Sequence, residues 1–321
     1  MRVLVAGGAG FIGSHLCERL LREGHDVVCL DNFVTGRRVN VEHLLDWPSF
    51  GLVEHDIIEG TPAMARVERV YHLASPASPP GYQRHPVATM RVNSEGSRHL
   101  LELATRDRAS YLYASTSEAY GDPLEHPQRE SYRGNVSTTG PRSMYDEAKR
   151  YGEALAMAYV RAHGTDARIV RIFNTYGPRS DPHDGRLVPN FIVQALRNEA
   201  MTVYGDGQQT RSLCYVSDLV DGLMRAMECP GARGEVTNLG NPDEHTVLEF
   251  ARVIRDLAGS TAPITYTAPA VGDDPQRRRP DISKARALLG WEPQVALRDG
   301  LERTIAAFRE ELGAEGMACA S

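Results

Sequence analysis

The chain has 321 residues, of which 41% are hydrophobic and 24% are charged, and its formal net charge is −6. This length suffices for one large domain or two coupled domains, and the acidic balance gives no reason to expect a nucleic-acid partner. No apolar stretch reaches the ~20 residues of a membrane span and no signal peptide is visible, so no membrane partner and a cytoplasmic location are expected. The spacing of the five cysteines suggests neither a disulfide framework nor a metal site.

The first 31 residues predict a strand, a turn, a helix and a second strand. An apolar run at residues 3–5 precedes Gly7, Gly10 and Gly13, and an amphipathic helix then leads to a second apolar run that ends at Asp31. Glycines in such a turn let a diphosphate approach the backbone N–H groups at the helix N-terminus. Asp31 is placed to accept hydrogen bonds from a ribose diol, which favours NAD over NADP.

Further apolar runs alternate with helical patterns along the next 140 residues. Strands are expected at residues 52–54, 70–74, 111–114 and 168–172, and helices at 87–106 and 145–162. This alternation predicts an α/β fold with a doubly wound parallel (Rossmann) sheet covered on both faces. Ligands bind at the carboxyl ends of such strands. Polar residues that follow the strands should therefore share one edge, among them Asp31, Asp56, Ser75, residues 115–118 and Asn174.

Past residue 175, proline and glycine become frequent and the strands become short, which indicates a smaller mixed α/β lobe over the ligand edge. We expect the sheet domain to comprise residues 1–175 and about 213–240. The substrate-binding lobe should comprise residues 176–212 and 241–312, and residues 313–321 should form a flexible tail.

Tyr145 and Lys149 are the residues best suited to proton transfer. They stand four apart in an expected helix, so the phenol and the ammonium group share a face. A nearby cation stabilises a phenolate, which would make Tyr145 a usable base near neutral pH.

Ten stretches resemble the extended short-chain dehydrogenase/reductase family of nucleotide-sugar enzymes over nearly the whole chain. They are GGAGFIGSHL, LDNFVTGRR, HLASPASPPGY, ASTSEAYGDP, YDEAKR, RIFNTYGPR, HDGRLVPNFI, VYGDGQQTRSLCYVSDLV, NLGNPDEHT and DDPQRRRPDI. Three narrower stretches, HLASPASPP, TSEAYGDP and DDPQRRRPDI, are most similar to the family members that convert UDP-glucuronate to UDP-xylose. The resemblance implies oxidation at C4, loss of the C6 carboxylate as carbon dioxide and return of hydride to C4. The NAD cofactor would then be tightly held and reset within each cycle.

The resemblance also assigns roles to individual residues. The catalytic residues it implies are Thr116, Ser117, Glu118, Tyr145, Lys149 and Arg278. The cofactor residues are Gly7, Gly10, Phe11, Ile12, Gly13, Asp31, Asn32, Phe33, Thr35, Gly36, Asp56, Ile57, Leu73, Ser75, Tyr145 and Lys149. The residues for a UDP-sugar substrate are Tyr82, Arg91, Asn174, Arg186, Asn190, Tyr204, Arg211 and Arg278. No metal ligands are implied.

Several alternatives share the first half-reaction. A 4,6-dehydratase of this family has an aspartate where this chain has Ser117, and a serine cannot usefully protonate a leaving hydroxide. A 4-epimerase would lose no carbon, and its pattern usually lacks Glu118. A decarboxylase could also stop at the 4-keto pentose, and a non-catalytic NAD-binding regulator could share the fold. The resemblance further implies a homodimer formed by the helices expected at 87–106 and 145–162.

Overall fold

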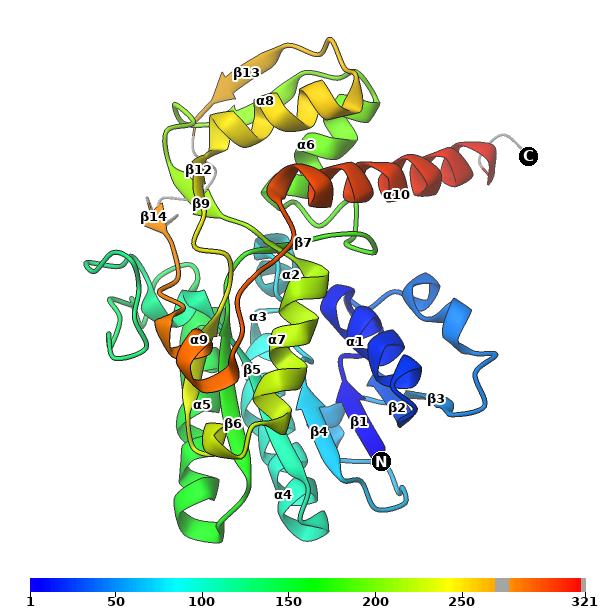
Figure 1. Ribbon diagram of the computed structural model, residues 1–321, viewed down its shortest axis with the longest axis vertical. Coiled ribbons are helices and arrows are strands. Elements are labelled where there is room, and N and C mark those ends of the chain that lie inside the picture. The colour runs from blue at the N-terminus through cyan, green and yellow to red at the C-terminus, as the bar shows by residue number, and fades with distance from the viewer. Residues whose placement is uncertain (269–276, 319–321) are drawn as a thin grey trace.

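The computed structural model of the protein describes residues 1–268 and 277–318, with side chains to residue 313. Figure 1 shows a large sheet with helices in its lower half and a smaller lobe above it. Residues 273–276 of the stretch DDPQRRRPDI and residues 319–321 of the expected tail lie outside the described residues.

The large sheet confirms the predicted doubly wound parallel fold. Its seven strands are all parallel and run in the order β11, β6, β5, β4, β1, β2, β3. The chain winds outward from β1 to β3 on one side and from β4 to β11 on the other. The crevice for a ligand therefore opens where β1 and β4 are neighbours. The strand bounds are β1 Arg2–Ala6, β2 Asp26–Asp31, β3 Phe50–Glu54, β4 Arg69–His72, β5 Ser110–Thr116, β6 Ala167–Ile172 and β11 Val236–Leu239.

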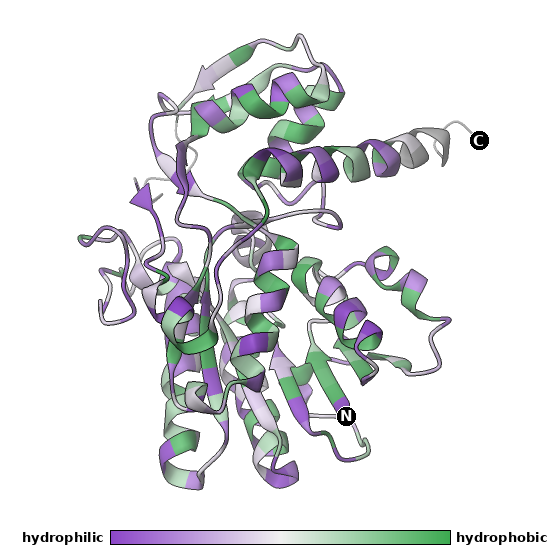
Figure 2. Cartoon of the chain, viewed as in Figure 1, coloured by the Kyte–Doolittle hydropathy of each residue, from purple (hydrophilic) through white to green (hydrophobic). Residues whose placement is uncertain are grey.

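Alternating side chains of β1 supply both faces of the core, as the period of a strand requires. Val3 and Val5 lie in one apolar cluster, while Leu4 and Ala6 lie in a second. Helices α1 (Phe11–Arg22) and α7 (Val216–Glu228) complete the first cluster, and α4 (Ser97–Asp107) and α5 (Ser143–His163) complete the second. Figure 2 shows the mainly hydrophobic strands between helices that alternate hydrophobic and hydrophilic sides.

The single helix expected at 87–106 is three segments. Helix α3 (Pro86–Arg91) passes into a π-helical turn, Val92–Gly96, and then into α4. The buried Asn93 in this turn donates to the Thr89 carbonyl and to Ser75 Oγ, at 2.8 and 2.9 Å. A Cβ on Gly96 would stand 2.8 Å from the Ile57 side chain. The contacts with Ser75 and Ile57, which follow strands of the sheet, accompany the wide turn. Such π-helical turns are common near functional sites.

The smaller lobe is built around helices α6 (Leu187–Leu196), α8 (Val247–Ala258) and α10 (Leu297–Ala318). Helix α8 begins with a capping box between Thr246 and Glu249. The short strands are β8 Met201–Tyr204, β9 Thr210–Ser212, β12 Glu244–Thr246, β13 Ile264–Thr267 and β14 Arg277–Arg278. Parallel pairing of β14 with β9 brings Arg278 beside Arg211.

Connections between sheet and lobe differ in detail from the expected division. Strands β7 (Thr175–Tyr176) and β10 (Cys214–Tyr215) pair beneath the lobe. Helix α9 (Ser283–Leu289) precedes Trp291, whose indole N–H donates to the Asp218 carbonyl of α7, so this part of the expected lobe lies on the sheet domain. Helix α10 continues to Ala318, beyond the residue 313 at which a tail was expected. Within the described ranges, no helix is both long and apolar enough to cross a bilayer.

Candidate active site

The glycine turn brings β1 and the start of α1 into close contact. Gly7 has a φ of +80°, and a Cβ there would stand 2.6 Å from the Ala74 backbone nitrogen. A Cβ on Gly13 would collide with the Gly7 carbonyl oxygen. Helix α1 begins after Gly10, which caps it without a side chain, so its first N–H groups stay accessible. The turn can therefore receive a diphosphate, in a space that residues larger than glycine would occupy.

Asp31 ends β2 with its carboxylate held in place. Its oxygens accept hydrogen bonds from the Ala9 and Phe33 backbone N–H groups, both at 2.9 Å. Burial raises the pKa of this carboxyl, and the two backbone N–H groups oppose the shift. A Cβ on Gly36 would stand 2.5 Å from Asp31 Oδ1, so the loop after β2 closes tightly over the acid. This geometry fits a carboxylate that receives ribose hydroxyls.

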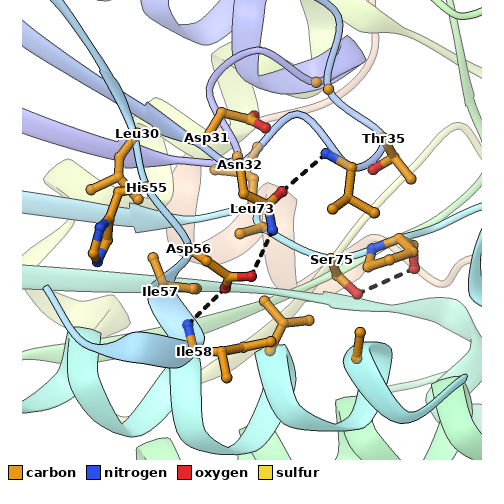
Figure 3. A pocket seen from close by; sticks show the side chains of 18 residues that line it. Leu30, Asp31, Asn32, Thr35, His55, Asp56, Ile57, Ile58, Leu73 and Ser75 are labelled. Atoms are coloured by element: carbon orange, nitrogen blue, oxygen red, sulfur yellow. Dashed lines mark hydrogen bonds between the residues drawn. The ribbon is translucent and has the colours of Figure 1, made fainter. Parts of the chain in front are cut away.

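A cavity opens beside the glycine turn and Asp31. Figure 3 shows Asn32 between the Val34 N–H group and Asp56, with Asn32 Nδ2 donating to Asp56 Oδ2 at 3.0 Å. Asp56 also accepts from the Ile58 N–H group at 2.9 Å. The predicted cofactor residues that line this cavity are Gly7, Gly10, Asp31, Asn32, Thr35, Gly36, Asp56, Ile57, Leu73 and Ser75.

Other predicted cofactor residues lie nearby without lining this cavity. Gly13 packs against the glycine turn, and Phe33 has a φ of 57° with its ring under the Arg38 guanidinium. Phe11 and Ile12 form the start of α1, and Tyr145 and Lys149 belong to α5. Lining residues that the sequence reasoning missed are Leu30, Val34, His55, Ile58, Ala74, Pro76, Ala88 and Val92. Leu30, His55 and Ala74 adjoin the ends of strands, a position that could have indicated them.

Tyr145 and Lys149 lie one helical turn apart on the buried face of α5. Lys149 Nζ donates to the Ala114 carbonyl of β5 at 2.9 Å and lies 5.9 Å from the centre of the Tyr145 ring. Burial lowers the pKa of Lys149 to about 7, and Glu153, one turn further along α5, opposes the shift. The structure therefore brings the phenol and the amine together as predicted.

The pKa of Tyr145 does not lie near neutrality in the protein without its ligands, in contrast to the prediction. Burial raises the pKa of Tyr145 to about 12, while a hydrogen bond with the Thr116 side chain lowers it. Glu118 adds to the rise because a neighbouring anion disfavours the phenolate. Burial is the largest influence on the Tyr145 pKa, which sequence spacing could not reveal.

The turn after β5 holds Glu118 between arginines from two distant segments. Glu118 Oε2 accepts from Arg278 at 2.9 Å and from Arg142 at 2.6 Å. Arg278 is 2% exposed and also donates to the Ser117 carbonyl at 2.6 Å. Burial raises the pKa of Glu118, but Arg278, Arg142 and Arg211 together hold it below its usual value. Glu118 is thus an anion, and Arg278 is buried against it rather than exposed to solvent.

Arg142 and Asp146 are two site residues that sequence reasoning missed. They stand four residues apart at the start of α5, and Asp146 is 7% exposed. The spacing around Tyr145 places both on the turn that faces Glu118, a helical signal that could have indicated them.

Tyr82, a predicted substrate residue, stacks on Tyr145. The ring centres are 4.9 Å apart and the planes are inclined by 11°. The Tyr82 hydroxyl is buried and has no hydrogen-bond partner in the part of the chain that the structure describes. This residue comes from α2 (Pro79–Arg84), whose first turn is capped by the Ser78 side chain.

Most of the predicted substrate residues lie between the sheet edge and the lobe. Asn174 follows β6 and accepts from the Cys214 N–H group through its carbonyl at 2.9 Å. Arg186 pairs with Asp184 and acts electrostatically on Tyr145. Arg211 is buried and acts on Glu118 and Arg278. Asn190 donates to the Gly185 carbonyl at 3.1 Å near the start of α6.

Two predicted substrate residues lie apart from this group. Arg91 pairs with Glu95 at 2.8 Å and with Glu59 at 3.9 Å, and Asp56 of the cofactor side acts on it electrostatically. The structure therefore places Arg91 near the cofactor cavity rather than near Tyr145. Tyr204 ends β8 and is 44% exposed. Residues 1–268 and 277–318 contain no group of three or more metal-ligating side chains suited to an ion.

Comparison with known proteins agrees with this geometry. UDP-glucuronic acid decarboxylase 1 of Xenopus tropicalis is 52% identical over 311 residues, covering 97% of this chain and 73% of that protein. The solved structure of UDP-glucose 4-epimerase from Thermotoga maritima with UDP-glucose has a TM-score of 0.89 at 32% identity, covering 97% of this chain and all of that one. UDP-glucuronic acid 4-epimerase from Bacillus cereus, in complex with UDP-glucuronic acid and NAD, has a TM-score of 0.87 at 29% identity with the same coverage. The model of the NAD dependent epimerase/dehydratase family matches residues 3–240, and the chain therefore belongs to that family.

Proposed function

We propose that this protein decarboxylates UDP-glucuronate to UDP-xylose, as the named activity of its 52% identical relative suggests. The observation that carries the proposal is the pairing of Glu118 with Arg278 beside Tyr145, with Arg278 also bound to the Ser117 carbonyl. A guanidinium in this position suits the carboxylate of a hexuronate.

The cofactor of this family fits the residues present. The glycine turn, the Asp31 carboxylate and the adjoining cavity suit a diphosphate, a ribose and an adenine, respectively. Gly7, Gly10 and Gly13 would hold the diphosphate, Asp31 the ribose diol, and Asp56 the adenine amino group. Bound NAD would supply the hydride acceptor and donor that oxidation and re-reduction at C4 require. Tight retention of the cofactor is part of the proposal.

Tyr145 is the base for the C4 hydroxyl. Thr116 holds the phenol by a hydrogen bond, and Lys149 lies on the same helix face with its Nζ 5.9 Å from the centre of the Tyr145 ring. Once C4 is a ketone, the C6 carboxylate is β to it, so the electrons of the breaking C5–C6 bond pass into an enolate. Donors around O4 stabilise that negative charge and lower the barrier to loss of carbon dioxide.

Loss of water from C6 or simple epimerisation is less well supported by this site. Ser117 is a hydroxyl without an acidic proton for a leaving hydroxide, and its carbonyl is occupied by Arg278. Glu118 is held as an anion by arginines, so it too is a poor acid. Epimerases and dehydratases share the fold, and product analysis separates them from a decarboxylase.

The test is incubation of the purified protein with UDP-glucuronate, with and without added NAD. We expect one carbon dioxide and one UDP-xylose per substrate, and turnover without a stoichiometric demand for NAD. Absence of carbon dioxide under both conditions would refute the activity. Accumulation of UDP-4-keto-pentose and reduced cofactor would show that the enzyme stops half-way. Tyr145→Phe should lower turnover about 10²- to 10⁴-fold while NAD still binds.

We further propose a homodimer through α3 and α5, and we keep the prediction of a cytoplasmic location. Val87 and Met90 of α3 and Tyr151 of α5 are large and exposed, at 68%, 48% and 52%. Exposed apolar side chains on neighbouring helices suit an interface with a second copy. Met90→Glu should shift the solution mass from dimer toward monomer, measured by light scattering. A wild-type protein that is already monomeric would contradict the proposal.

A further inference from the structure

The proposed reaction, on which this inference rests, consumes one proton per turnover. Loss of carbon dioxide leaves the electron pair of the C5–C6 bond in an enolate over C4 and C5. C5 must then take up a proton before the C4 ketone is reduced. The protein therefore needs a group near the sugar that holds a proton at neutral pH and can release it.

Most side chains of the described site cannot fill this role. Glu118 is kept ionised by its arginines. Arg142 and Arg278 keep their protons at any working pH. Tyr145 takes the O4 proton in the first step and must give it back to O4 in the last, so its proton is already committed. The Thr116 hydroxyl is too weak an acid, and Lys149 donates its N–H to the Ala114 carbonyl of β5.

Asp146 differs from all of these. It follows Tyr145 on α5, is more than nine-tenths buried, and its Oδ1 atom is buried without a hydrogen-bond partner among the side chains and backbone that the structure describes. Buried polar atoms are rarely left unpaired unless a ligand or a catalytic role explains them. The charged groups that act on Asp146 are Glu118 after β5, Arg278 of β14, Arg142 beside α5 and Glu147 within α5. Asp146 in turn acts on the phenols of Tyr82 in α2 and Tyr145 in α5.

The pKa values of the Asp146 and Glu118 carboxyls are shifted in opposite directions. Burial raises the pKa of Asp146 to about 7, and the Glu118 anion adds to the rise while Arg142 and Arg278 oppose it. The same arginines lower the pKa of Glu118. A pair in which one carboxyl stays protonated and its neighbour ionised is the usual arrangement of an acid beside an electrostatic partner.

We propose that Asp146 is the acid that protonates C5 after carbon dioxide has left. The Asp146 O–H bond breaks, its proton forms the new C5–H bond with the enolate electron pair, and C4 becomes a ketone again. Asp146 is left as a carboxylate and regains a proton from solvent, which balances the proton consumed overall. Glu118 stays anionic throughout and keeps the Asp146 proton in place until the enolate forms.

The experiment compares Asp146→Asn with the wild type and with Glu147→Gln. Glu147 is the next acid on the same helix, lies 3.6 Å from Arg150 and is a matched loss of one carboxylate. Single turnovers with UDP-glucuronate are followed by near-ultraviolet absorbance of the reduced cofactor, by carbon dioxide release and by UDP-xylose. The same turnovers in D2O show, by NMR, which C5 hydrogen position receives deuterium.

For Asp146→Asn we expect cofactor reduction at a nearly normal rate and UDP-xylose formation slowed about 10²- to 10⁴-fold, with the reduced cofactor accumulating. Deuterium should enter both C5 positions, because solvent then protonates the enolate without direction. Glu147→Gln should behave as the wild type. Normal UDP-xylose formation by Asp146→Asn, with a single labelled C5 position, would overturn the proposal in favour of water as the acid.

Equal loss of cofactor reduction and product formation would also overturn it, because that pattern indicates a structural role. If the variant does not fold, the wild type decides: its product-forming step should slow as pH rises above about 7, and a step unaffected across neutrality would contradict the assignment. A wild-type protein that releases no carbon dioxide at all would instead refute the proposed function.

Discussion

Tyr82 lies nearly parallel to Tyr145, with ring centres 4.9 Å apart. The contact fixes the plane of the Tyr145 ring, and offset aromatic contacts of this kind are worth about 0.5–1.5 kcal/mol beyond their buried area. Among the described residues the Tyr82 hydroxyl has no hydrogen-bond partner, so a bound substrate is the partner we expect.

Tyr82→Phe and Tyr82→Leu should separate these two contributions. Phenylalanine keeps the stack and loses one hydrogen bond, so KM should rise about 3- to 10-fold with kcat nearly unchanged. Leucine also frees the Tyr145 ring, so kcat should fall about 10-fold as well. Steady-state kinetics with UDP-glucuronate measures both, and Tyr266→Phe on the exposed side of β13 is the control. An unchanged KM for Tyr82→Phe would show that its hydroxyl does not contact the substrate.

Gly36→Ala tests whether Asp31 binds the cofactor ribose. The new Cβ would stand 2.5 Å from Asp31 Oδ1 and 2.8 Å from its Cγ, so the carboxylate must leave the Ala9 and Phe33 N–H groups. Hydrogen bonds to a charged group contribute about 1.5–3 kcal/mol each, so NAD affinity should fall about 10- to 100-fold. Calorimetric titration of cofactor-free protein measures the change.

Gly51→Ala in β3 is the matched control for that substitution. A Cβ at this glycine meets no atom within 4 Å, so the affinity for NAD should be that of the wild type. Equal affinities for the Gly36 and Gly51 variants would show that Asp31 does not hold the ribose.

The parts of the site that follow single strands or one helix face could be predicted from sequence. Asp31 ends a strand after a glycine turn, and Tyr145 and Lys149 share one helix face, so local spacing was enough. The pairing of Glu118 with Arg278 needed the family resemblance, because 160 residues separate them. Arg142 and Asp146 were missed because their role depends on charges that meet only after β5, α5 and β14 pack together.

The pKa of Tyr145 and the π-helical turn in residues 92–96 could not be predicted from the sequence, for the same reason. Spacing predicted a phenol activated by Lys149, but burial raises the pKa of Tyr145 to about 12. The pattern at 87–106 fits one helix, but tertiary contacts of Asn93 and Gly96 accompany a π-helical turn within it. Both outcomes are set by neighbours from other elements.

Glu153 and Arg171 form a buried ion pair behind Lys149. Glu153 accepts from Arg171 at 2.7 and 2.9 Å and from Ser115 Oγ at 2.5 Å. Glu153→Gln leaves a buried guanidinium without its anion, so the free energy of unfolding should fall by about 3–5 kcal/mol. Replacing the pair by Glu153→Leu with Arg171→Met should cost less than Glu153→Gln alone, measured by urea unfolding. A larger loss for the double variant would contradict this account.

The stability of the protein should depend on pH through Asp146. Its pKa is raised to about 7 from an ordinary value of 3.8, so between these limits the folded state binds more protons than the unfolded state. The free energy of unfolding should therefore decrease as pH rises from about 4 to about 7 and stay lowered above that range. Asparagine carries no charge to bury, so Asp146→Asn should escape this loss.

The difference between Asp146→Asn and the wild type is the measurement that isolates this effect. Urea unfolding should give similar stabilities near pH 4 and a variant that gains on the wild type up to about pH 7, by at most about 4 kcal/mol at 1.36 kcal/mol per pKa unit. Glu147→Gln should instead run parallel to the wild type across the range. A constant difference between Asp146→Asn and the wild type would mean that Asp146 ionises as freely in the folded protein as in the unfolded chain. It could then hold no proton for C5 at neutral pH.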